Sequence, residues 1–599
     1  MPIKRTFGWI QNPGDLKKLK LVVSIFQTGS PAHTWLMTDK IPTLLKYGLM
    51  GQADYNTFQA ELSKSELEIG YSLLKGKGAG VSGRKNALCT GIIQAVVDAQ
   101  STRTYIDDTG TSVTMKKPYT DDWSADGYLR WAISCGLLEY NRVTDTCKIS
   151  TLGKRLALSA DDSPEECEVL TEALLSYPPV VRILSILKEK NEQTKFELGS
   201  QLGFIGELGF TSVSQELFLH DYCTAFANER SDIRSNFEGD ADKYARGIAS
   251  WLIQMNWVTS CRKTTSGDYK GKIYSAELQV YSLTRAGERA LIKAQGNSSN
   301  PRLPRVVMFE MLASNKAPNA EYLRFQRACL LKALNTWKTP EQLQNALRRR
   351  SIKLSISAVT DHIAGLISIG LNIVERDGKY KLLDIITQLD IPTQTAYSSD
   401  SINEMKEMVR SRLKAVNHKY LILIDLAYSG ASSRSRESSD AREFEIQTAE
   451  LLTKELDFHG MRLGDANRPD IIISYGSKGT IIDTKSYRDG FSIDKHSADE
   501  MSRYIMENRK RLPRVPANEW WRNFEPQVAE FTFLFITSFL KGRFDEQLEY
   551  ISLTQEGIKG AAINVVNLLY LADSLKIGEI RYYEFFELFK EHEIHTTYC

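Results

Sequence analysis

The sequence predicts a multidomain α+β protein, with three winged-helix-like units followed by a C-terminal α/β domain built on a mixed sheet. Its 599 residues are too many for one hydrophobic core, so we expect several domains. A helix followed by two short strands recurs three times before residue 388. Beyond residue 403 the pattern becomes helix, hairpin, helix and strand, which is typical of an α/β domain.

Each of the three repeated units joins an amphipathic helix to a β-ribbon. The first has a helix within Ser124–Tyr140 and a turn through Asp145. The second has a helix within Asp242–Val258 and a turn at Ser266–Asp268, and the third, Ile356–Asp384, contains an Asp-Gly hairpin turn. This outline is typical of winged helix-turn-helix modules, which commonly place a helix in the DNA major groove. Docking of other proteins is the alternative use that the pattern leaves open.

Composition and charge exclude several classes of protein. The net charge is +2, from 76 basic and 74 acidic residues, so any DNA-binding surface must be local. The eight cysteines contain no CxxC pair, which favours reduced thiols in a cytosol. The N-terminus lacks a signal-peptide core, and no apolar run is long enough to span a membrane. We therefore expect a cytoplasmic protein without a membrane partner.

Two strand-like segments in the last third carry the clearest chemical signal. PDIIISYG begins with a Pro-Asp pair at Asp470, and GTIIDTKSY places Asp483 and Lys485 two residues apart, on one face of a strand. Two carboxylates suit Mg²⁺, and an ammonium can orient an attacking water and stabilise developing negative charge. The pattern PD…DxK is seen in many nucleases, so the segments predict a metal-dependent phosphodiesterase site.

A surface strand with a cross-strand ion pair is the alternative interpretation. Two isoleucines lead directly into Asp483, which favours a buried site, because unpaired charges are costly to bury. Glu445, on an acidic helix upstream, is a candidate for a further carboxylate. From their spacing alone, Asp499 and Arg503 form an ion pair within the exposed helix that follows.

Several segments together resemble one family. KRTFGWIQNPG, SYPPVVRIL, FEGDADKYAR, NRPD with DTKSY, ADEMSRY and NEWW occur in consistent order from the N-terminus to about residue 595. They resemble the FokI-like type IIS restriction endonucleases, and we expect StsI or another close relative within that family. The resemblance implies a Mg²⁺-dependent deoxyribonuclease that binds a short asymmetric DNA site, GGATG-like, and cuts both strands at a fixed distance outside it.

The resemblance also implies roles for individual residues. It makes Asp470 and Asp483 the metal ligands and Lys485 the catalytic lysine, in agreement with the residues themselves. It implies cleavage by a transient homodimer, with Asp499 and Arg503 bridging two subunits rather than pairing within one helix. Ser235 stands where the family has a base-contacting asparagine, and the loop at 101–120 is longer than in the family. The implied DNA-binding residues are Gln11, Asn12, Arg84, Trp123, Ser235, Glu238, Lys243 and Arg246.

Two other functions remain open at this point. One is a repair or resolvase nuclease of the same fold, which would lack the three winged-helix modules. The other is a DNA-binding regulator with an inactive nuclease-like domain, which would have no need to keep Asp470, Asp483 and Lys485 intact. The expected division is 1–158, 159–300 and 301–388 for the recognition subdomains, 389–402 for a linker and 403–599 for the PD-(D/E)xK cleavage domain.

Overall fold

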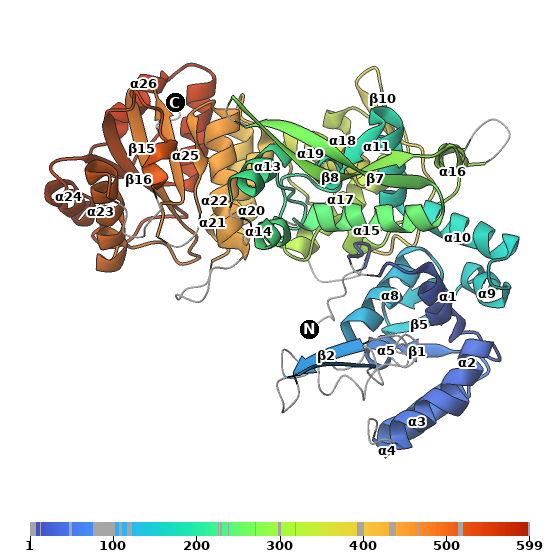
Figure 1. Ribbon diagram of the computed structural model, residues 1–599. Coiled ribbons are helices and arrows are strands. Elements are labelled where there is room, and N and C mark those ends of the chain that lie inside the picture. Colours follow the sequence, from blue (N-terminus) through green and yellow to red (C-terminus); the bar gives the residue numbers. More distant parts are fainter. Residues whose placement is uncertain are drawn as a thin grey trace.

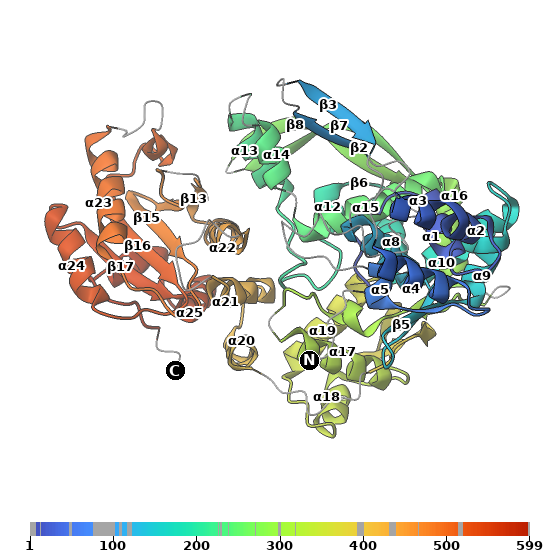
Figure 2. The same cartoon turned by 90° about the horizontal axis from the view of Figure 1, so that it is seen from below.

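The chain folds into an N-terminal part of three helix-rich units and a C-terminal α/β domain, which lie side by side in Figures 1 and 2. The computed structural model describes residues 7–11, 13–46, 51–75, 102–106, 111–116, 122–225, 227, 230–237, 239–269, 271–296, 301–317, 319–391, 400–430, 439–464, 467–512 and 519–596.

The first unit has the predicted helix and β-ribbon near its end. Asp145 lies in the ribbon turn with a φ of 55°, a left-handed value that aspartate tolerates. Trp131 of its helix α8 stacks on Trp251 of the second unit at 4.3 Å between ring centroids, so the two units share one core. Its elements are α1 (Leu16–Ser24), α2 (Pro31–Trp35), a π-helix (Leu36–Lys40), α3 (Ile41–Lys46), α4 (Gln52–Leu62), β1 (Glu68–Gly70), α5 (Tyr71–Lys75), β2 (Thr102–Ile106), β3 (Ser112–Lys116), α8 (Asp122–Ser134), β4 (Leu138–Asn141), β5 (Thr146–Ile149) and α9 (Thr151–Leu158).

The second unit differs from expectation in its ribbon. The predicted turn at Ser266–Asp268 lies inside β7, and the chain turns instead around Gly271, whose φ is 73°. The Asp268 carboxylate accepts a hydrogen bond from the Gly271 amide at 2.8 Å, which explains why an aspartate precedes this turn. The elements are α10 (Pro164–Ser176), α11 (Pro178–Lys190), β6 (Glu192–Thr194), α12 (Lys195–Gly199), α13 (Gln215–Thr224), α14 (Arg230–Asn236), α15 (Asp240–Gln254), β7 (Val258–Tyr269), β8 (Lys272–Leu283) and α16 (Arg285–Gln295).

The third unit confirms the predicted Asp-Gly hairpin. Asp377 and Gly378 have φ values of 51° and 69°, as a two-residue turn of this kind requires. They join β10 to β11 directly after α19. The elements are β9 (Arg305–Val306), a 3₁₀ helix (Phe309–Leu312), α17 (Ala320–Ala333), α18 (Pro340–Arg348), α19 (Ile356–Ser368), β10 (Ile373–Arg376), β11 (Lys379–Leu382) and β12 (Ile386–Thr387).

The C-terminal domain is built on a mixed five-stranded sheet in the order β13-β14-β15-β16-β17. The first three strands are antiparallel to their neighbours, and β15, β16 and β17 run parallel. One hydrophobic cluster covers each face of this sheet. The elements are α20 (Ser401–Arg412), α21 (Ile422–Ala427), α22 (Ser439–Glu450), a π-helix (Leu451–Glu455), β13 (His459–Arg462), β14 (Ile471–Tyr475), β15 (Lys478–Lys485), α23 (Lys495–Lys510), β16 (Glu530–Thr537), α24 (Phe544–Thr554), β17 (Lys559–Asn564), α25 (Val565–Lys576), α26 (Tyr582–Phe585) and 3₁₀ helices at His418–Leu421, Trp520–Asn523 and Phe586–Leu588.

Helix α20 begins inside the segment expected to be a linker. Asp400 caps it, with a side chain that accepts from the Asn403 amide at 2.8 Å. The preceding residues 392–399 lie outside the described part of the chain. The C-terminal domain therefore begins its first helix at Ser401 rather than at residue 403.

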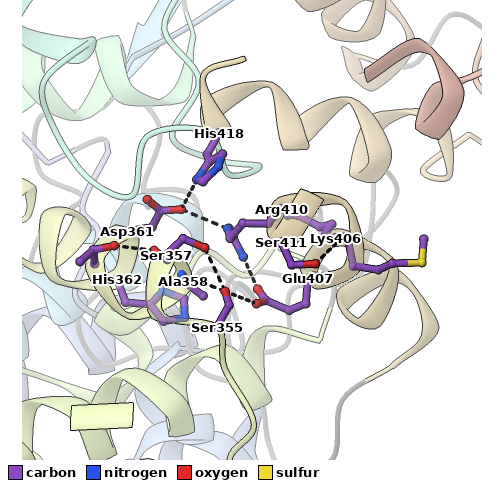
Figure 3. Close-up of polar contacts among 12 residues, drawn as sticks. Ser355, Ser357, Ala358, Asp361, His362, Lys406, Glu407, Arg410, Ser411 and His418 are labelled. Atoms are coloured by element: carbon purple, nitrogen blue, oxygen red, sulfur yellow. Dashed lines mark hydrogen bonds and ion pairs between the residues drawn. The ribbon is translucent and has the colours of Figure 1, made fainter. Parts of the chain in front are cut away.

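Polar contacts join α20 to α19 of the third unit, as Figure 3 shows. Asp361 lies 3.0 Å from Arg410 Nε and 3.0 Å from His418 Nδ1. Ser355 donates to Glu407 at 3.3 Å, and Glu407 also pairs with Arg410. Figures 1 and 2 show α20, α21 and α22 on the side of the C-terminal domain that faces the N-terminal part.

Within the described ranges, no single helix is long and apolar enough to cross a membrane. One pair, α10 and α11, passes that test together by length and composition alone, and its two helices meet at 88°.

Candidate active site and recognition residues

The hairpin of β14 and β15 brings two aspartates level with each other. The strands are antiparallel, and Ile471 lies opposite Ile482. The same register, carried one residue further, places Asp470 opposite Asp483. The two carboxylates predicted from PD…DxK therefore meet at one end of the hairpin.

Asp470 is held in place by Thr484, the residue between Asp483 and Lys485. Its Oδ2 atom accepts hydrogen bonds from the Thr484 amide at 2.7 Å and from the Thr484 hydroxyl at 2.9 Å. Its backbone carbonyl accepts from the Leu463 amide at 2.8 Å. These bonds fix the carboxylate toward β15 before any ligand arrives.

Lys485 lies directly against Asp483. Its ammonium is 3.0 Å from Oδ1 and 2.8 Å from Oδ2 of that carboxylate. Both side chains emerge on the face of β15 that also carries Ile481, which packs in the cluster containing Met501 and Tyr504 of α23. Asp483 is 3% exposed, so this pair is part of a covered sheet face and not of a solvated strand edge.

The electrostatics of the pair reflect its burial. Burial raises the pKa of the Asp483 carboxyl well above its usual range, Lys485 opposes the rise, and Asp470 and Glu500 add to it. Burial alone would lower the pKa of Lys485, but Asp483, Asp470 and Glu500 outweigh it, and the net shift is upward. Lys485 therefore carries its positive charge throughout the ordinary pH range.

The two aspartates fit a hard divalent cation. Among the residues that the structure describes, no group of three or more His, Cys, Asp or Glu is arranged to hold a metal ion. Asp470 and Asp483 nevertheless lie opposite each other across the hairpin, and the buried Asp483 Oδ2 lies 2.8 Å from the Lys485 ammonium without a well-oriented hydrogen bond. Mg²⁺ needs few protein ligands because it keeps several waters and binds phosphate oxygens. The donor set is therefore adequate for that ion.

Glu445 does not add a spare carboxylate to this site, contrary to expectation. Arg462 of β13 donates to its Oε2 atom from Nε at 2.9 Å and from Nη2 at 2.8 Å. Both side chains are buried, at 8% and 7% exposure. A carboxylate whose oxygen contacts two nitrogens of one guanidinium is already neutralised, which a helix pattern could not reveal.

Helix α23 lies over this face of the sheet. Asp494 caps its N-terminus, with a side chain that accepts from the Ser497 amide at 2.9 Å. Asp499 is exposed. Arg503 lies 3.5 Å from Glu500 and 3.6 Å from Glu507, so its ion pairs within this chain are with those glutamates.

The structure brings three of the expected DNA-binding residues to one place. Lys243 and Arg246 are one helical turn apart on α15, and Arg246 is exposed. The backbone carbonyl oxygen of Gln11 lies beside Gly247 of the same helix. A β-carbon added to Gly247 would be 3.5 Å from this oxygen. A cavity of about 220 Å³ adjoins this surface and is lined by Gln11 and Tyr244, among others.

The other five expected DNA contacts have no described side chain. Trp123 lies on α8 and Ser235 lies on α14, but only the backbone of each is described. Asn12, Arg84 and Glu238 lie outside the described residues.

Comparison with protein families covers most of the chain. Residues 5–159 match the model for FokI recognition domain subdomain 1, and residues 166–299 match that for subdomain 2. Residues 312–378 match the FokI D3 domain, and residues 399–595 match the FokI cleavage domain. The type II restriction enzyme FokI of Planomicrobium okeanokoites is 35% identical over 98% of this chain and 99% of its own length.

This chain belongs to the FokI-like type II restriction endonucleases. The type II restriction enzyme StsI of Streptococcus sanguinis is 29% identical over 94% of the chain and 91% of its own length, which excludes StsI itself as the identity. A solved structure of FokI matches with a TM-score of 0.86 at 34% identity, over 99% of this chain and 100% of that one. The structure of FokI bound to DNA matches with a TM-score of 0.87 at the same identity and coverage.

Family membership confirms the predicted fold class and enzyme class. The FokI-like chain has recognition subdomains followed by a cleavage domain, and it is a type IIS restriction endonuclease with a nuclease domain. Sequence reasoning missed Glu500, which reaches toward Lys485 from α23. Its spacing from Asp483 is set by an intervening loop, so no short motif contains it.

Proposed function

We propose that the FokI-like chain binds a GGATG-like asymmetric site in double-stranded DNA and hydrolyses both strands at a fixed distance outside it, with Mg²⁺ as cofactor. The placement of Asp470 opposite Asp483, with Lys485 against the latter, carries this proposal. In it the two aspartates hold the ion and Lys485 is the catalytic lysine. Bound Mg²⁺ supplies charge neutralisation at the phosphate and lowers the pKa of a bound water.

The protein groups have distinct tasks in the proposed hydrolysis. Thr484 orients Asp470, and the strand register keeps the two carboxylates at a fixed spacing. Lys485 donates hydrogen bonds to the attacking water and to the phosphate oxygen where negative charge develops. In this proposal Lys485 acts as a hydrogen-bond donor and an electrostatic stabiliser.

Recognition falls to the N-terminal part in this proposal. Gln11, Lys243 and Arg246 read base edges around α15, since amide groups suit adenine and cationic groups suit guanine. Asn12, Arg84, Trp123, Ser235 and Glu238 complete the proposed contact set. We assign recognition to residues 1–388 and cleavage to the C-terminal domain, a division that agrees with the matched family ranges.

We further propose that two cleavage domains associate on DNA through α23 and α24, because one site cuts one strand. These two helices pack together. Four large apolar residues on or beside these helices are exposed to solvent. Their exposed fractions are 39% for Met506, 66% for Leu512, 49% for Tyr550 and 77% for Leu553. Asp499 of one copy would pair with Arg503 of the other.

The cytoplasmic location of the protein stays a prediction.

One experiment tests the main proposal. The full chain is incubated with a plasmid library of short sites and Mg²⁺, and the ends of the products are sequenced. We expect staggered ends at constant offsets from a GGATG-like site and no cutting when EDTA replaces the metal. Site binding without any cutting would indicate an inactive nuclease domain, and cuts unrelated to sequence would contradict the recognition role.

A further inference from the structure

Glu500 lies between the active-site lysine and the arginine expected at the dimer contact. Its Oε2 atom is 4.0 Å from the Lys485 ammonium, and its Oε1 atom is 3.5 Å from Arg503 Nη2. The Tyr504 hydroxyl donates to the same Oε1 atom at 3.2 Å. Glu500 therefore contacts the active site through one oxygen and the α23 network through the other.

Arg503 is anchored at its other end by a buried carboxylate. Its Nη1 atom lies 3.6 Å from Glu507, which is 3% exposed. Glu507 in turn accepts from the Trp520 indole at 2.9 Å. Glu507 is fixed by this bond and by the core around it, whereas Glu500 is 27% exposed and has more freedom to move. A change at Arg503 is therefore transmitted mainly to Glu500.

The direction of the Lys485 ammonium depends on the carboxylates around it. Asp483 holds it at 2.8 Å, and that contact alone would draw the ammonium onto a proposed metal ligand. The negative charge of Glu500 attracts it from the side of α23. The ammonium is therefore held by Asp483 on its own strand and attracted by Glu500 on α23, so its position depends on both carboxylates.

We propose that Glu500 is a positioning residue that orients Lys485, and that it couples Lys485 to Arg503 through its shared carboxylate. This inference rests on the proposed function, since it assumes cleavage at Lys485 and contact with Arg503 by a second copy. Asp499 is exposed one helical turn before Arg503, so a second copy's Asp499 can pair with the guanidinium and fix it beside Glu500. Glu500 is then held more firmly next to Lys485, and association of two copies tightens the catalytic site.

Single-turnover cleavage of a duplex containing the site tests the positioning role, with enzyme in excess and above the concentration where the rate stops rising. We expect Glu500→Gln to slow cleavage at least tenfold while DNA affinity stays within twofold and the melting temperature within 2 °C. The matched control Glu530→Gln, exposed at the far end of the parallel strand pair, should stay within twofold of the parent. A Glu500→Gln rate within twofold of the parent overturns the inference.

A conservative variant separates charge from packing. Glu500→Asp keeps the charge but shortens the side chain, and we expect it to cleave at least threefold faster than Glu500→Gln. If Glu500 served only packing, the order would be reversed, because glutamine is the replacement of equal shape. The reversed order, or equal rates, would overturn the electrostatic role.

The coupling is tested with Arg503→Gln under the same saturating conditions. We expect a residual loss of at least threefold that disappears when Arg503→Gln is added to Glu500→Gln. Losses that multiply would show that the two residues act independently and would overturn the coupling. Failure of the proposed function is distinguishable, because then Lys485→Ala would cleave as fast as the parent, whatever Glu500 does.

Discussion

The proposed cleavage site and the proposed recognition surface of this chain are assembled in opposite ways. Asp470, Asp483 and Lys485 come from one hairpin, whose register brings them together. Gln11, Lys243 and Arg246, the proposed recognition residues whose side chains are described, come from two units and lie near one another because these units share a core. In the proposed function a compact local motif specifies the chemistry, whereas tertiary packing specifies the choice of DNA site.

The largest effect should come from removing one proposed metal ligand. Asp483→Ala should reduce cleavage on the order of a thousandfold or more, because a bound ion contributes several kcal/mol to the transition state. Site binding, measured by gel shift, should remain. Asp470→Ala should behave in the same way, and retained cleavage by either variant would contradict the assignment of the site.

A substitution at the proposed recognition surface should weaken DNA binding without changing the cleavage step. Arg246→Ala should weaken binding to the site by about 1–3 kcal/mol, as expected for loss of a base contact. Its cleavage rate on saturating DNA should be nearly unchanged. The exposed Arg543→Ala on the cleavage domain is a control of the same type. Equal losses for specific and unrelated DNA would make Arg246 a phosphate contact instead.

A smaller effect is expected where the cleavage site depends on a second copy. Arg503→Ala should slow double-strand cleavage about tenfold at low enzyme concentration, corresponding to about 1.4 kcal/mol of association free energy. The loss should be partly recovered at high concentration, while binding to the site is intact. Unchanged kinetics at low concentration would count against the dimer.

One residue of α15, Asp242, should report on both regions. Burial raises the pKa of Asp242 to about 7, and Glu443 of α22 adds to the rise despite a hydrogen bond from Ser212. The folded state keeps this proton to higher pH than the unfolded state, so stability falls as pH rises from about 4 to about 7. Asp242→Asn should therefore lose less melting temperature than the parent between about pH 4 and about pH 7. The exposed Asp39→Asn should match the parent, and an equal slope in Asp242→Asn would contradict the shift.

Sequence patterns predicted the features that depend on residues close together in the chain. The Asp377-Gly378 turn and the mixed sheet follow from spacing alone, and so does the shared strand face of Asp483 and Lys485. The turn of the second ribbon was misplaced because Ser266 and Gly267 are turn-forming residues that β7 nevertheless accommodates.

Errors at the site have a common physical cause. Glu445 looked available because its partner, Arg462, lies on another element. Spacing alone pairs Arg503 with Asp499, but Arg503 lies between Glu500 and Glu507, and helical spacing permits all three partners. Tertiary packing chose among partners that the sequence offers equally.

The cap at Asp400 decides where the cleavage domain can be excised as a portable module. A fragment of residues 400–599 keeps the carboxylate that accepts from the Asn403 amide, whereas one of residues 403–599 begins inside the first turn of α20. Loss of such a cap costs about 1 kcal/mol, so the longer fragment should unfold at higher denaturant concentration. Identical midpoints would mean that the first turn frays once it is detached. For fusion to a foreign DNA-binding domain, the junction therefore belongs before Asp400.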